Sequence, residues 1–416
     1  MITLADCRAL DAVDPLAQFR SRFALPAGTV YLDGNSLGAL PAATPARMQD
    51  LIVNQWGQDL IGSWNRHGWI DLPQRLGDKI GHLLGAAPGQ LVVGDSTSIN
   101  VFKVLSAALQ LRRGRTRIVS ERGNFPTDLY IAQGLSELLA RGHRLELIDI
   151  DPLDIGSLDA VLDGDTAVVL LTQVDYRSGR LLDMARITAR VQAAGAMMIW
   201  DLAHSAGALP VELDAAGADF AVGCGYKYLN GGPGAPAFVY AARRHHATMQ
   251  PALAGWFGHA DPFAFDRAYR PAAGIDRLLV GTPPLLSLAA LEVGVDLMSE
   301  ANAQALRAKS LSLKGLFIAL VDQRLAEWQL RLDTPREADA RGSQVSLGHA
   351  ECWAIMQALI AEHGIGDFRA PDVLRFGFAP LYNSHHDVWL AVDRLHGILA
   401  TRRWDSPAFR ERARVT

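Results

Sequence analysis

Short apolar runs alternate with stretches of helical periodicity through the middle of the chain, and Gly and Pro separate them. Runs bounded in this way are typical of strands and helices joined by turns. The pattern predicts strands over Arg117–Ser120, Arg144–Ile150, Ala167–Val174, Ala196–Asp201, Asp219–Cys224 and Ala235–Tyr240, and helices over Val101–Leu109, Asp128–Leu139 and Asp183–Ala194. This alternation indicates an α/β domain, in which helices cover both faces of a mostly parallel sheet.

The pattern changes after Pro284. It predicts a long helical region over Leu285–Trp328, then a strand over Gln344–Leu347, a helix near Glu351–Glu362, a strand near Val373–Phe378 and a last helix near His386–Leu399. Helices mixed with short strands are typical of an α+β unit. We therefore expect a large α/β domain over residues 46–284, and a smaller α+β domain formed by residues 1–45 and 285–416.

Bulk composition excludes several classes of partner. The chain has 416 residues, of which 49% are hydrophobic, so it can bury a large core. A net charge of −4 and a pI near 6.3 give no electrostatic case for nucleic acid or an anionic membrane. No apolar segment reaches membrane-spanning length, and the start lacks a signal peptide. We expect a cytoplasmic protein.

Cysteine and histidine give no metal site. Cys7, Cys224 and Cys352 form neither a disulfide framework nor a zinc pattern. The pairs His245-His246 and His385-His386 are adjacent in sequence, and adjacent side chains rarely reach one ion, so we interpret them as surface residues. We expect no bound metal.

Lys227 and Asp201 each end an apolar run, on strands that we expect to be neighbours. Burial lowers the proton affinity of a lysine and makes it a nucleophile able to form a Schiff base. Pyridoxal 5'-phosphate (PLP) has the matching polarity, because its aldehyde binds a lysine and its ring nitrogen needs a carboxylate. The alternatives are a surface lysine at a strand end and an aspartate that caps the next helix.

Further residues of the same strand ends fit such a cofactor. Thr97 and Ser98 precede a helical run, where hydroxyls and free N–H groups attract a phosphate, although simple helix capping explains them equally well. Phe125 follows the first clear strand and could stack on a ring or pack on its own helix. Thr172 is expected to project toward the same rim.

The chain resembles a known family, the kynureninases, which are PLP-dependent hydrolases with the PLP-dependent transferase-like fold type I. The resemblance covers almost the whole chain. It is carried by Tyr31–Gly38, Gly94–Ser98, Asn124–Asp128, Trp200–Gly207, Gly225–Gly234, Gly255–His259 and Arg375–Asn383. The segments around Asp201 and Lys227 are shared by many related PLP enzymes. The tryptophan segment, Gly255–His259, and the C-terminal segment, Arg375–Asn383, are more specific.

The resemblance implies a role for each site residue. Lys227 would bind the cofactor covalently, Asp201 would pair with its ring nitrogen, and Phe125 would stack on the ring. Asp128, Thr172 and His204 would lie close by. Thr97, Ser98 and Tyr226 would hold the phosphate, helped by Trp256 of the partner subunit and Thr282 of the partner subunit, so the active unit would be a homodimer with shared sites. Tyr226 is also expected to relay protons through the phosphate.

The resemblance also implies the substrate and the reaction. Arg375 would clamp the substrate carboxylate, with a structural ion pair as the alternative. Asn35, Trp64 and Thr282 would line the pocket for the aryl ketone. Trp64 and Thr282 resemble the bacterial pattern, which favours kynurenine over its 3-hydroxy form. The expected reaction is hydrolysis of L-kynurenine to anthranilate and L-alanine, in tryptophan breakdown and NAD precursor supply.

Three other functions remain open from the residues. A cysteine desulfurase shares this fold and needs a reactive cysteine downstream of the lysine, but Cys352 lies in an apolar run that predicts a packed helix. A simple aminotransferase would leave the tryptophan and C-terminal segments unexplained. A protein that binds PLP without catalysis would be expected to lack Lys227 or Arg375.

Overall fold

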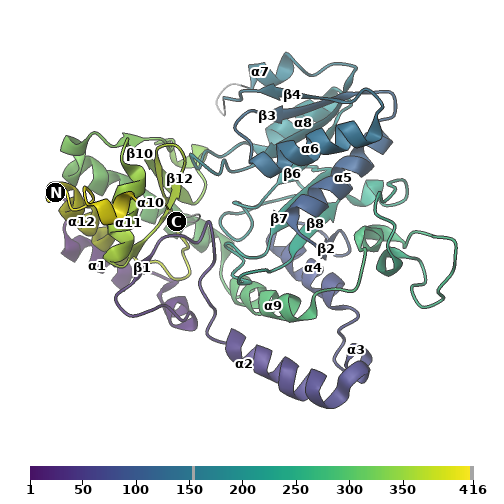
Figure 1. The fold of residues 1–416 in the computed structure, drawn as a ribbon, viewed down its shortest axis with the longest axis horizontal. Helices are drawn as coiled ribbons and strands as arrows, with labels where there is room; N and C mark the ends of the chain where they lie inside the picture. Colours follow the sequence, from purple (N-terminus) through teal and green to yellow (C-terminus); the bar gives the residue numbers. More distant parts are fainter. Residues whose placement is uncertain (152–154, 413–416) are drawn as a thin grey trace.

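A seven-stranded sheet forms the centre of the larger part of the molecule in the computed structural model, which describes residues 1–151 and 155–412 (Figure 1). The strand order is β2-β8-β7-β6-β5-β3-β4. The bounds are β2 (Leu91–Val93), β3 (Arg117–Glu121), β4 (Arg144–Ile148), β5 (Thr166–Thr172), β6 (Met197–Asp201), β7 (Phe220–Cys224) and β8 (Ala237–Ala241). From β7 to β4 the strands are parallel, and β8 runs antiparallel to both its neighbours. The prediction of a mostly parallel sheet is confirmed.

Helices cover both faces of this sheet, as the alternation of elements predicts. The helices are α4 (Leu72–Leu83), α5 (Thr97–Leu111), α6 (Pro126–Leu139), α7 (Gly156–Asp159), α8 (Met184–Ala193) and α9 (Leu285–Ser299). Because successive side chains of a strand point to opposite faces, Val168 and Leu170 pack with α5 and α6, whereas Val169 and Leu171 pack with α4, α8 and α9. Burial on both sides explains why the five residues between the terminal threonines of β5 are all apolar.

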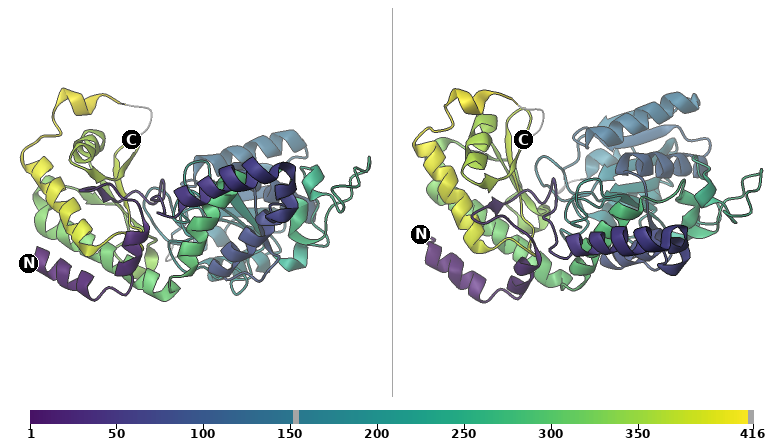
Figure 2. Two further views of the ribbon diagram at one scale, coloured as in Figure 1. Left: turned by 90° about the horizontal axis from the view of Figure 1, so that it is seen from below. Right: turned by 60° about the horizontal axis from the view of Figure 1, so that its bottom comes forward.

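The smaller part contains a four-stranded sheet of order β12-β13-β10-β9 and a separate parallel pair, β1 with β11. The strands are β1 (Val30–Tyr31), β9 (Arg331–Leu332), β10 (Gln344–Gly348), β11 (Gly364–Ile365), β12 (Asp367–Arg369) and β13 (Val373–Gly377). The helices are α1 (Leu4–Ala12), α10 (Ala303–Arg324), α11 (Cys352–Ala361), α12 (His385–Ala400) and α13 (Pro407–Arg410). The two ends of the chain meet here, because α1 lies against α12 (Figure 2).

The region predicted as helical over Leu285–Trp328 is helical, and it consists of two helices followed by a 3-10 turn. Helix α9 ends at Ser299, and Asn302 caps the start of α10 through a hydrogen bond from the Ala305 amide. Leu288 and Leu291 of α9 pack in the core of the large sheet, whereas α10 packs in the core of the smaller part. The proposed division into domains at residues 45/46 and 284/285 stays a prediction, and its last four residues lie outside the described chain.

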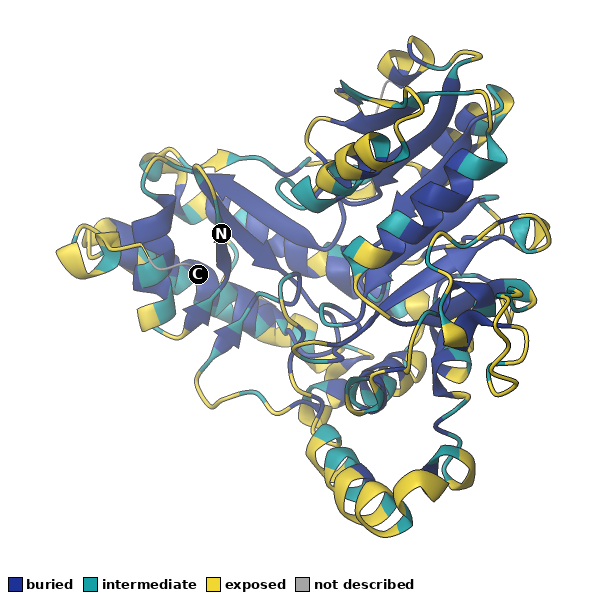
Figure 3. Cartoon of the chain, turned by 45° about the vertical axis from the view of Figure 1, so that its right-hand side comes forward, coloured by how far each residue is buried: buried dark blue, intermediate teal, exposed yellow. Residues whose placement is uncertain are grey.

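An arm of residues 44–66 projects from the large part, and much of its surface is exposed (Figure 3). It consists of α2 (Thr44–Gln49), a π-helix η2 (Asp50–Asp59), a 3-10 turn η3 (Leu60–Gly62) and α3 (Ser63–Arg66). Its exposed large apolar side chains are Ile52, Val53, Trp56, Leu60 and Ile61. Such a patch is typical of a surface that another protein covers.

Short 3-10 turns complete the chain. Their bounds are η1 (Ala17–Arg22), η4 (Arg243–His245), η5 (Trp256–Gly258), η6 (Gly274–Leu278), η7 (Ala326–Trp328) and η8 (Ala338–Ala340). None of the helices within the described ranges is long and apolar enough to cross a bilayer.

Candidate active site

The candidate site is a cavity of about 240 Å³ at the carboxyl ends of β6 and β7, bordered by the first turns of α5 and α6. Ligands of open α/β sheets bind at this edge. The residues that line it are Ser96, Thr97, Ser98, Phe125, Thr127, Asp128, Asp201, Ala203, His204, Tyr226 and Lys227. The structure thus brings most of the predicted cofactor residues into one place, although their roles stay predictions.

Lys227 lines this cavity, and its Nζ is 3.3 Å from Nε2 of His204. Burial is the main cause that lowers the pKa of Lys227; nearby Cys224 and Asp201 oppose the shift. Burial also holds the pKa of His204 well below its usual value, and the charge of Lys227 adds to this effect. The imidazole is therefore a neutral partner for the amine, and the amine is easier to deprotonate, as a nucleophile requires.

Two buried carboxylates face the same cavity. Burial raises the pKa of Asp201, and the charge of Lys227 opposes the shift. Burial, followed by the charge of Asp201, raises the pKa of Asp128 well above its usual value, while Asn124 lowers it slightly. Neither oxygen of Asp128 has a well-formed hydrogen bond within the described residues. Because unpaired buried acids are costly, these acceptor oxygens fit a ligand that brings a protonated ring nitrogen as a donor.

The first turn of α5 borders the same cavity and has the features of an anion site. Ser96 caps the helix by accepting a hydrogen bond from a main-chain amide, and Thr97 and Ser98 are the first helical residues. Asp95 adopts a left-handed backbone conformation, with φ of 56°, and buried Lys103 holds its carboxylate at 2.5 Å. The turn therefore points hydroxyls and the positive end of the helix dipole into the cavity, as phosphate binding requires.

Aromatic residues bound the cavity on two sides. Phe125 precedes α6 and is 43% exposed, and its ring contacts Tyr176 edge to face at 5.2 Å. Phe125 lines the cavity, where an aromatic ring can stack on a planar ligand. Burial is the main cause that raises the pKa of Tyr226, so its hydroxyl keeps its proton at neutral pH.

Thr172 is not part of the cavity lining. It pairs with Asp201 in the sheet register, and its hydroxyl donates to the carbonyl oxygens of Val174 at 3.3 Å and Asp201 at 3.4 Å. Thr172 therefore supports the strand end from behind Asp201. Its predicted contact with the cofactor stays a prediction.

Arg375 also lies outside the cavity lining, in a buried ion pair with Asp367. Its Nε donates to Asp367 Oδ1 at 2.8 Å, its Nη1 to the Tyr176 carbonyl at 2.6 Å and its Nη2 to Ser36 Oγ at 2.8 Å. The charge of Arg375 nevertheless acts on the pKa of Lys227. Both interpretations of Arg375 thus have support, since it forms a structural ion pair next to the site.

Asn35 and Trp64 occupy different surroundings. Asn35 is fully buried, donates to Gln344 Oε1 at 3.4 Å and has a main-chain hydrogen bond with His204, so it adjoins the cavity without lining it. Trp64 is half-buried on the arm, edge to face with Trp69 at 6.0 Å. The described chain alone does not bring Trp64 to the cavity.

Trp256 and Thr282 are exposed at the surface of this chain and do not line its cavity. Trp256 is 41% exposed and packs edge to face with Phe257 and Phe263. Their predicted contacts are therefore not made within one chain.

Sequence reasoning missed the charged residues that surround Arg375. Ser36 and Arg369 both contact Asp367, and Asp33 lies beside them. Burial, followed by the charge of Asp367, raises the pKa of Asp33 to about 8. The available signal was the spacing of Asp367 and Arg369 on a short strand, which places both side chains on one face.

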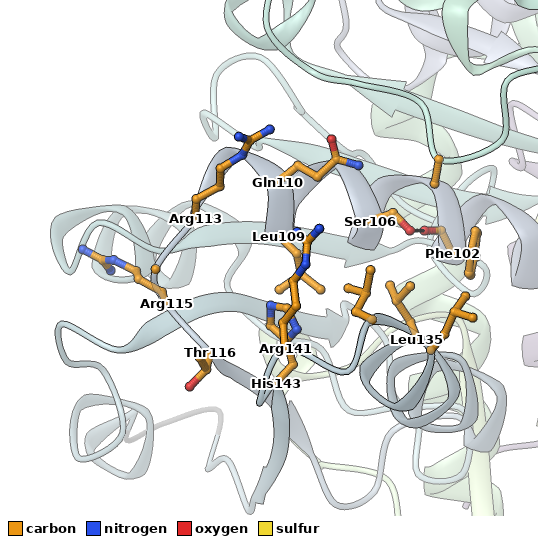
Figure 4. A pocket seen from close by; sticks show the side chains of 14 residues that line it. Phe102, Ser106, Leu109, Gln110, Arg113, Arg115, Thr116, Leu135, Arg141 and His143 are labelled. Atoms are coloured by element: carbon orange, nitrogen blue, oxygen red, sulfur yellow. Dashed lines mark hydrogen bonds between the residues drawn. The ribbon is translucent and has the colours of Figure 1, made fainter.

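A larger cavity, of about 580 Å³, lies between α5 and α6, away from Lys227 (Figure 4). Leu109 and Leu135 lie among its apolar residues, and Arg113, Arg141 and His143 are among its basic ones. It has no acid paired with a buried lysine, so size alone does not mark the chemical site.

Cys352 does not have the properties of a reactive thiol. It is fully buried at the start of α11, and its Sγ contacts the Asp372 carbonyl at 3.0 Å. Burial raises the pKa of this thiol to about 12. Because a nucleophilic cysteine must be an accessible thiolate, this geometry opposes the desulfurase alternative.

The paired histidines are occupied by other contacts. His245 lies 2.7 Å from the Asp219 carboxylate, His246 contacts the Ala241 carbonyl, and His385 lies 2.9 Å from Asp11. Among residues 1–151 and 155–412, no three His, Cys, Asp or Glu side chains gather as metal ligands would.

Solved structures identify the fold. The cysteine desulfurase of Thermococcus onnurineus NA1 is 19% identical, with a TM-score of 0.76 over 92% of this chain and 98% of that one. The cysteine desulfurase CsdA of Escherichia coli is 21% identical, with a TM-score of 0.74 over 94% of this chain and 99% of that one. A C-DES mutant solved with glycine covalently linked to the PLP cofactor has a TM-score of 0.77 at 17% identity, over 91% of this chain and 98% of that one. The predicted PLP-dependent transferase-like fold type I is confirmed.

Sequence comparison identifies the family. The model of the kynureninase C-terminal domain matches residues 306–395. Over 420 aligned residues, which cover 100% of both chains, this protein is 53% identical to the kynureninase of Burkholderia pseudomallei (strain 1106a) and 51% identical to that of Pseudomonas fluorescens. The chain belongs to the kynureninase family.

Proposed function

We propose that this protein is a PLP-dependent hydrolase that converts L-kynurenine to anthranilate and L-alanine. The observation that carries the proposal is the buried Lys227, which shares one cavity with Asp201 and an anion-binding helix start, in a chain more than half identical over its full length to kynureninases. We further propose that it acts in the cytoplasm, in tryptophan breakdown and NAD precursor supply.

The cavity fits PLP residue by residue. Lys227 would bind its aldehyde carbon, Asp201 would face its ring nitrogen, and Phe125 would stack on the ring. Asp128 and His204 would lie along its edge, while Thr97, Ser98 and Tyr226 would take the phosphate at the start of α5. When bound, PLP supplies an electron sink that stabilises negative charge next to the substrate amine.

The chain's own residues then hold and move protons. Lys227 removes the substrate α proton, because burial lowers its pKa and frees its lone pair. His204, neutral and 3.3 Å away, keeps the amine in position. Tyr226 retains its proton at neutral pH and is the proposed donor in the relay.

The carboxylate and the aryl ketone of the substrate are the groups that we expect to set specificity. Arg375 would attract the α-carboxylate, and Asn35, Trp64 and Thr282 would surround the aryl ketone, to whose carbonyl carbon water adds. We propose that this set favours kynurenine over 3-hydroxykynurenine. Asn35 supports the assignment, because it adjoins His204 and has an unpaired buried side-chain oxygen.

A homodimer with shared active sites would explain why Trp256 and Thr282 do not line the cavity of their own chain. A second cavity, of about 450 Å³, adjoins the first and shares Ser96, Thr97 and Tyr226 with it. We propose that the partner's Trp256 and the partner's Thr282 fill this region. The exposed apolar arm supports the proposal, because it needs a covering surface.

One assay tests the activity. Purified protein with PLP and L-kynurenine should release fluorescent anthranilate, and Lys227→Ala should not. L-cysteine as substrate should release no sulfide. Protein that shows a borohydride-sensitive absorbance from bound cofactor, yet forms no anthranilate, would refute the proposal.

A further inference from the structure

Two guanidinium groups share one carboxylate beside the candidate active site. In the register of β12 and β13, Asp367 lies directly opposite Arg375. Arg369 is two residues further along β12, so its side chain projects from the same face as Asp367. The Nη2 of Arg369 is 2.9 Å from Asp367 Oδ2 and donates to Ser36 Oγ at 3.2 Å.

The two arginines differ in what they can still bind. The side chain of Arg375 is only 1% exposed, and it already donates to both Asp367 oxygens, to Ser36 and to the Tyr176 carbonyl. Little of its donor capacity is left, since a guanidinium has about five N–H groups.

Arg369 keeps accessible donors. Its side chain is 34% exposed, and among the described residues its Nη1 donates to the Phe368 carbonyl alone, at 3.3 Å. The Nε–H group of Arg369 makes no hydrogen bond within residues 1–151 and 155–412. An incoming oxygen anion can therefore reach Arg369 without breaking the ion pair of Asp367.

The charge of Arg369 acts on the cavity. Burial is the main cause that lowers the pKa of Lys227 and of His204, and Arg369 adds to the shift at both. The cluster also adjoins the cavity in space, because Arg375 donates to the Tyr176 carbonyl at 2.6 Å and the Tyr176 ring contacts Phe125, which lines the cavity.

The cluster has an excess of positive charge. Asp367 is the one carboxylate that pairs with both arginines. Asp33 is beside it, but burial raises the pKa of Asp33 to about 8, which leaves it mostly protonated at neutral pH. Two cations and one anion in a half-buried site favour a further anion.

We propose that Arg369 is a second carboxylate-binding residue, which receives the α-carboxylate of an amino-acid substrate next to Arg375. Asp367 and Ser36 fix the two guanidinium groups, Arg375 supplies buried charge, and Arg369 supplies the accessible N–H groups. The inference rests on the proposed function, and it makes Arg369 a determinant of selection for amino acids over the corresponding amides and amines.

The test compares two ligands that differ only at this group. L-alanine carries a carboxylate, and L-alaninamide carries a neutral amide in its place. Calorimetry gives the dissociation constant of each for the PLP-loaded wild type, Arg369→Gln, Arg369→Lys and a control, Arg402→Gln. Arg402 is matched in chemistry but pairs with Asp405 on the surface, where its side chain is 70% exposed.

Arg369→Gln should weaken L-alanine binding by at least about tenfold, because a hydrogen bond to a charged group contributes roughly that much. L-alaninamide binding should stay within about twofold, and Arg369→Lys should recover part of the loss because it keeps the charge. Arg402→Gln should change neither ligand. PLP affinity and thermal unfolding should be similar in all four proteins.

Two results would overturn the assignment of Arg369. In one, Arg369→Gln weakens both ligands equally or neither; in the other, wild type itself does not prefer L-alanine over L-alaninamide. The proposed function is tested separately: it fails if the wild-type protein forms no anthranilate from L-kynurenine. The ratio of the two ligand affinities is measurable in either case.

Discussion

Replacing Asp367 by Asn tests whether the charged cluster beside the active site also holds the fold together. Asp367 is 2% exposed and accepts hydrogen bonds from Arg375 and Ser36. The substitution keeps the shape of the side chain and removes its charge. Two guanidinium groups would then remain in the protein, one of them fully buried, without a carboxylate partner.

The magnitude follows from this burial. Removing one partner of a buried ion pair costs about 3–5 kcal/mol of unfolding free energy. Asn retains one acceptor oxygen, so we expect the lower end, about 3 kcal/mol. With an unfolding entropy of about 0.9 kcal/mol/K for a chain of this length, the melting temperature should fall by about 3–4 °C.

The pH dependence has a definite sign. Burial alone would raise the pKa of Asp367, but the charges of Arg375 and Arg369 outweigh it and hold the pKa below its usual value of 3.8. A group with a lowered folded pKa stabilises the protein above its unfolded pKa, and loses that effect as pH falls through the folded value. The difference in unfolding free energy between wild type and Asp367→Asn should be largest near pH 7 and should shrink below about pH 4.

The assay is urea unfolding followed by circular dichroism at several pH values. A matched control is Asp322→Asn, because Asp322 pairs with Arg336 where both side chains are about half exposed. Such a surface pair contributes less than about 1 kcal/mol. If Asp367→Asn costs no more than this control, the cluster does not behave as a buried ion pair and the reasoning is refuted.

Three further predictions concern Lys227, the stability of the protein at low pH and the cysteine desulfurase alternative. Lys227→Ala should lower anthranilate formation by at least about 10²-fold, because it removes the proposed proton acceptor; mass spectrometry after borohydride should show the cofactor fixed to wild type only, and an adduct on the variant would contradict this role. In wild type, burial would raise the pKa of Asp219, but hydrogen bonds led by that from His245 lower it to about 2. Its stabilising effect should therefore be present above about pH 4 and be lost toward pH 2, so the urea midpoints of wild type and Asp219→Asn should converge over that range, and parallel curves would argue against it. Cys352→Ala should leave the rate of anthranilate formation within about twofold, and iodoacetamide should not label Cys352 in the native protein, because the thiol is buried with a pKa of about 12; rapid labelling of that residue would reopen the desulfurase alternative.

The arrangement of the central sheet could be predicted because its strands are long, apolar and punctuated by glycine. Parallel strands end at one edge, so the charged residue after each run had to lie near its neighbours. Asp201 and Lys227 are found together for this reason. Helix α6 starts at Pro126, two residues before the predicted start, because proline favours the first helical position.

The cluster around Asp367 could not be predicted in the same way. Strand β12 has three residues, too few to show a period, and its partners come from segments far apart in the sequence. Residues 44–66 gave no signal of an exposed arm, because apolar side chains in a helix predict a buried face unless a second chain is considered. The proposed contacts of Trp256 and Thr282 with the active site of a partner subunit are hidden for the same reason, since they depend on a second chain.

Fold and chemistry are fixed by different parts of this molecule. The cysteine desulfurases superpose on nearly the whole chain at 19% and 21% identity, so the architecture that brings Lys227 to its cavity does not by itself choose a reaction. A desulfurase needs a mobile thiolate that reaches the substrate, whereas Cys352 is packed under β10 and β13 with its proton retained. Next to the cavity lies an arginine-rich cluster on β12 and β13, which we propose to bind a substrate carboxylate. Because cysteine and kynurenine both carry an α-carboxylate, this cluster selects amino acids but does not choose between the two reactions. The buried thiol of Cys352, which keeps its proton, is the feature that argues against sulfur transfer.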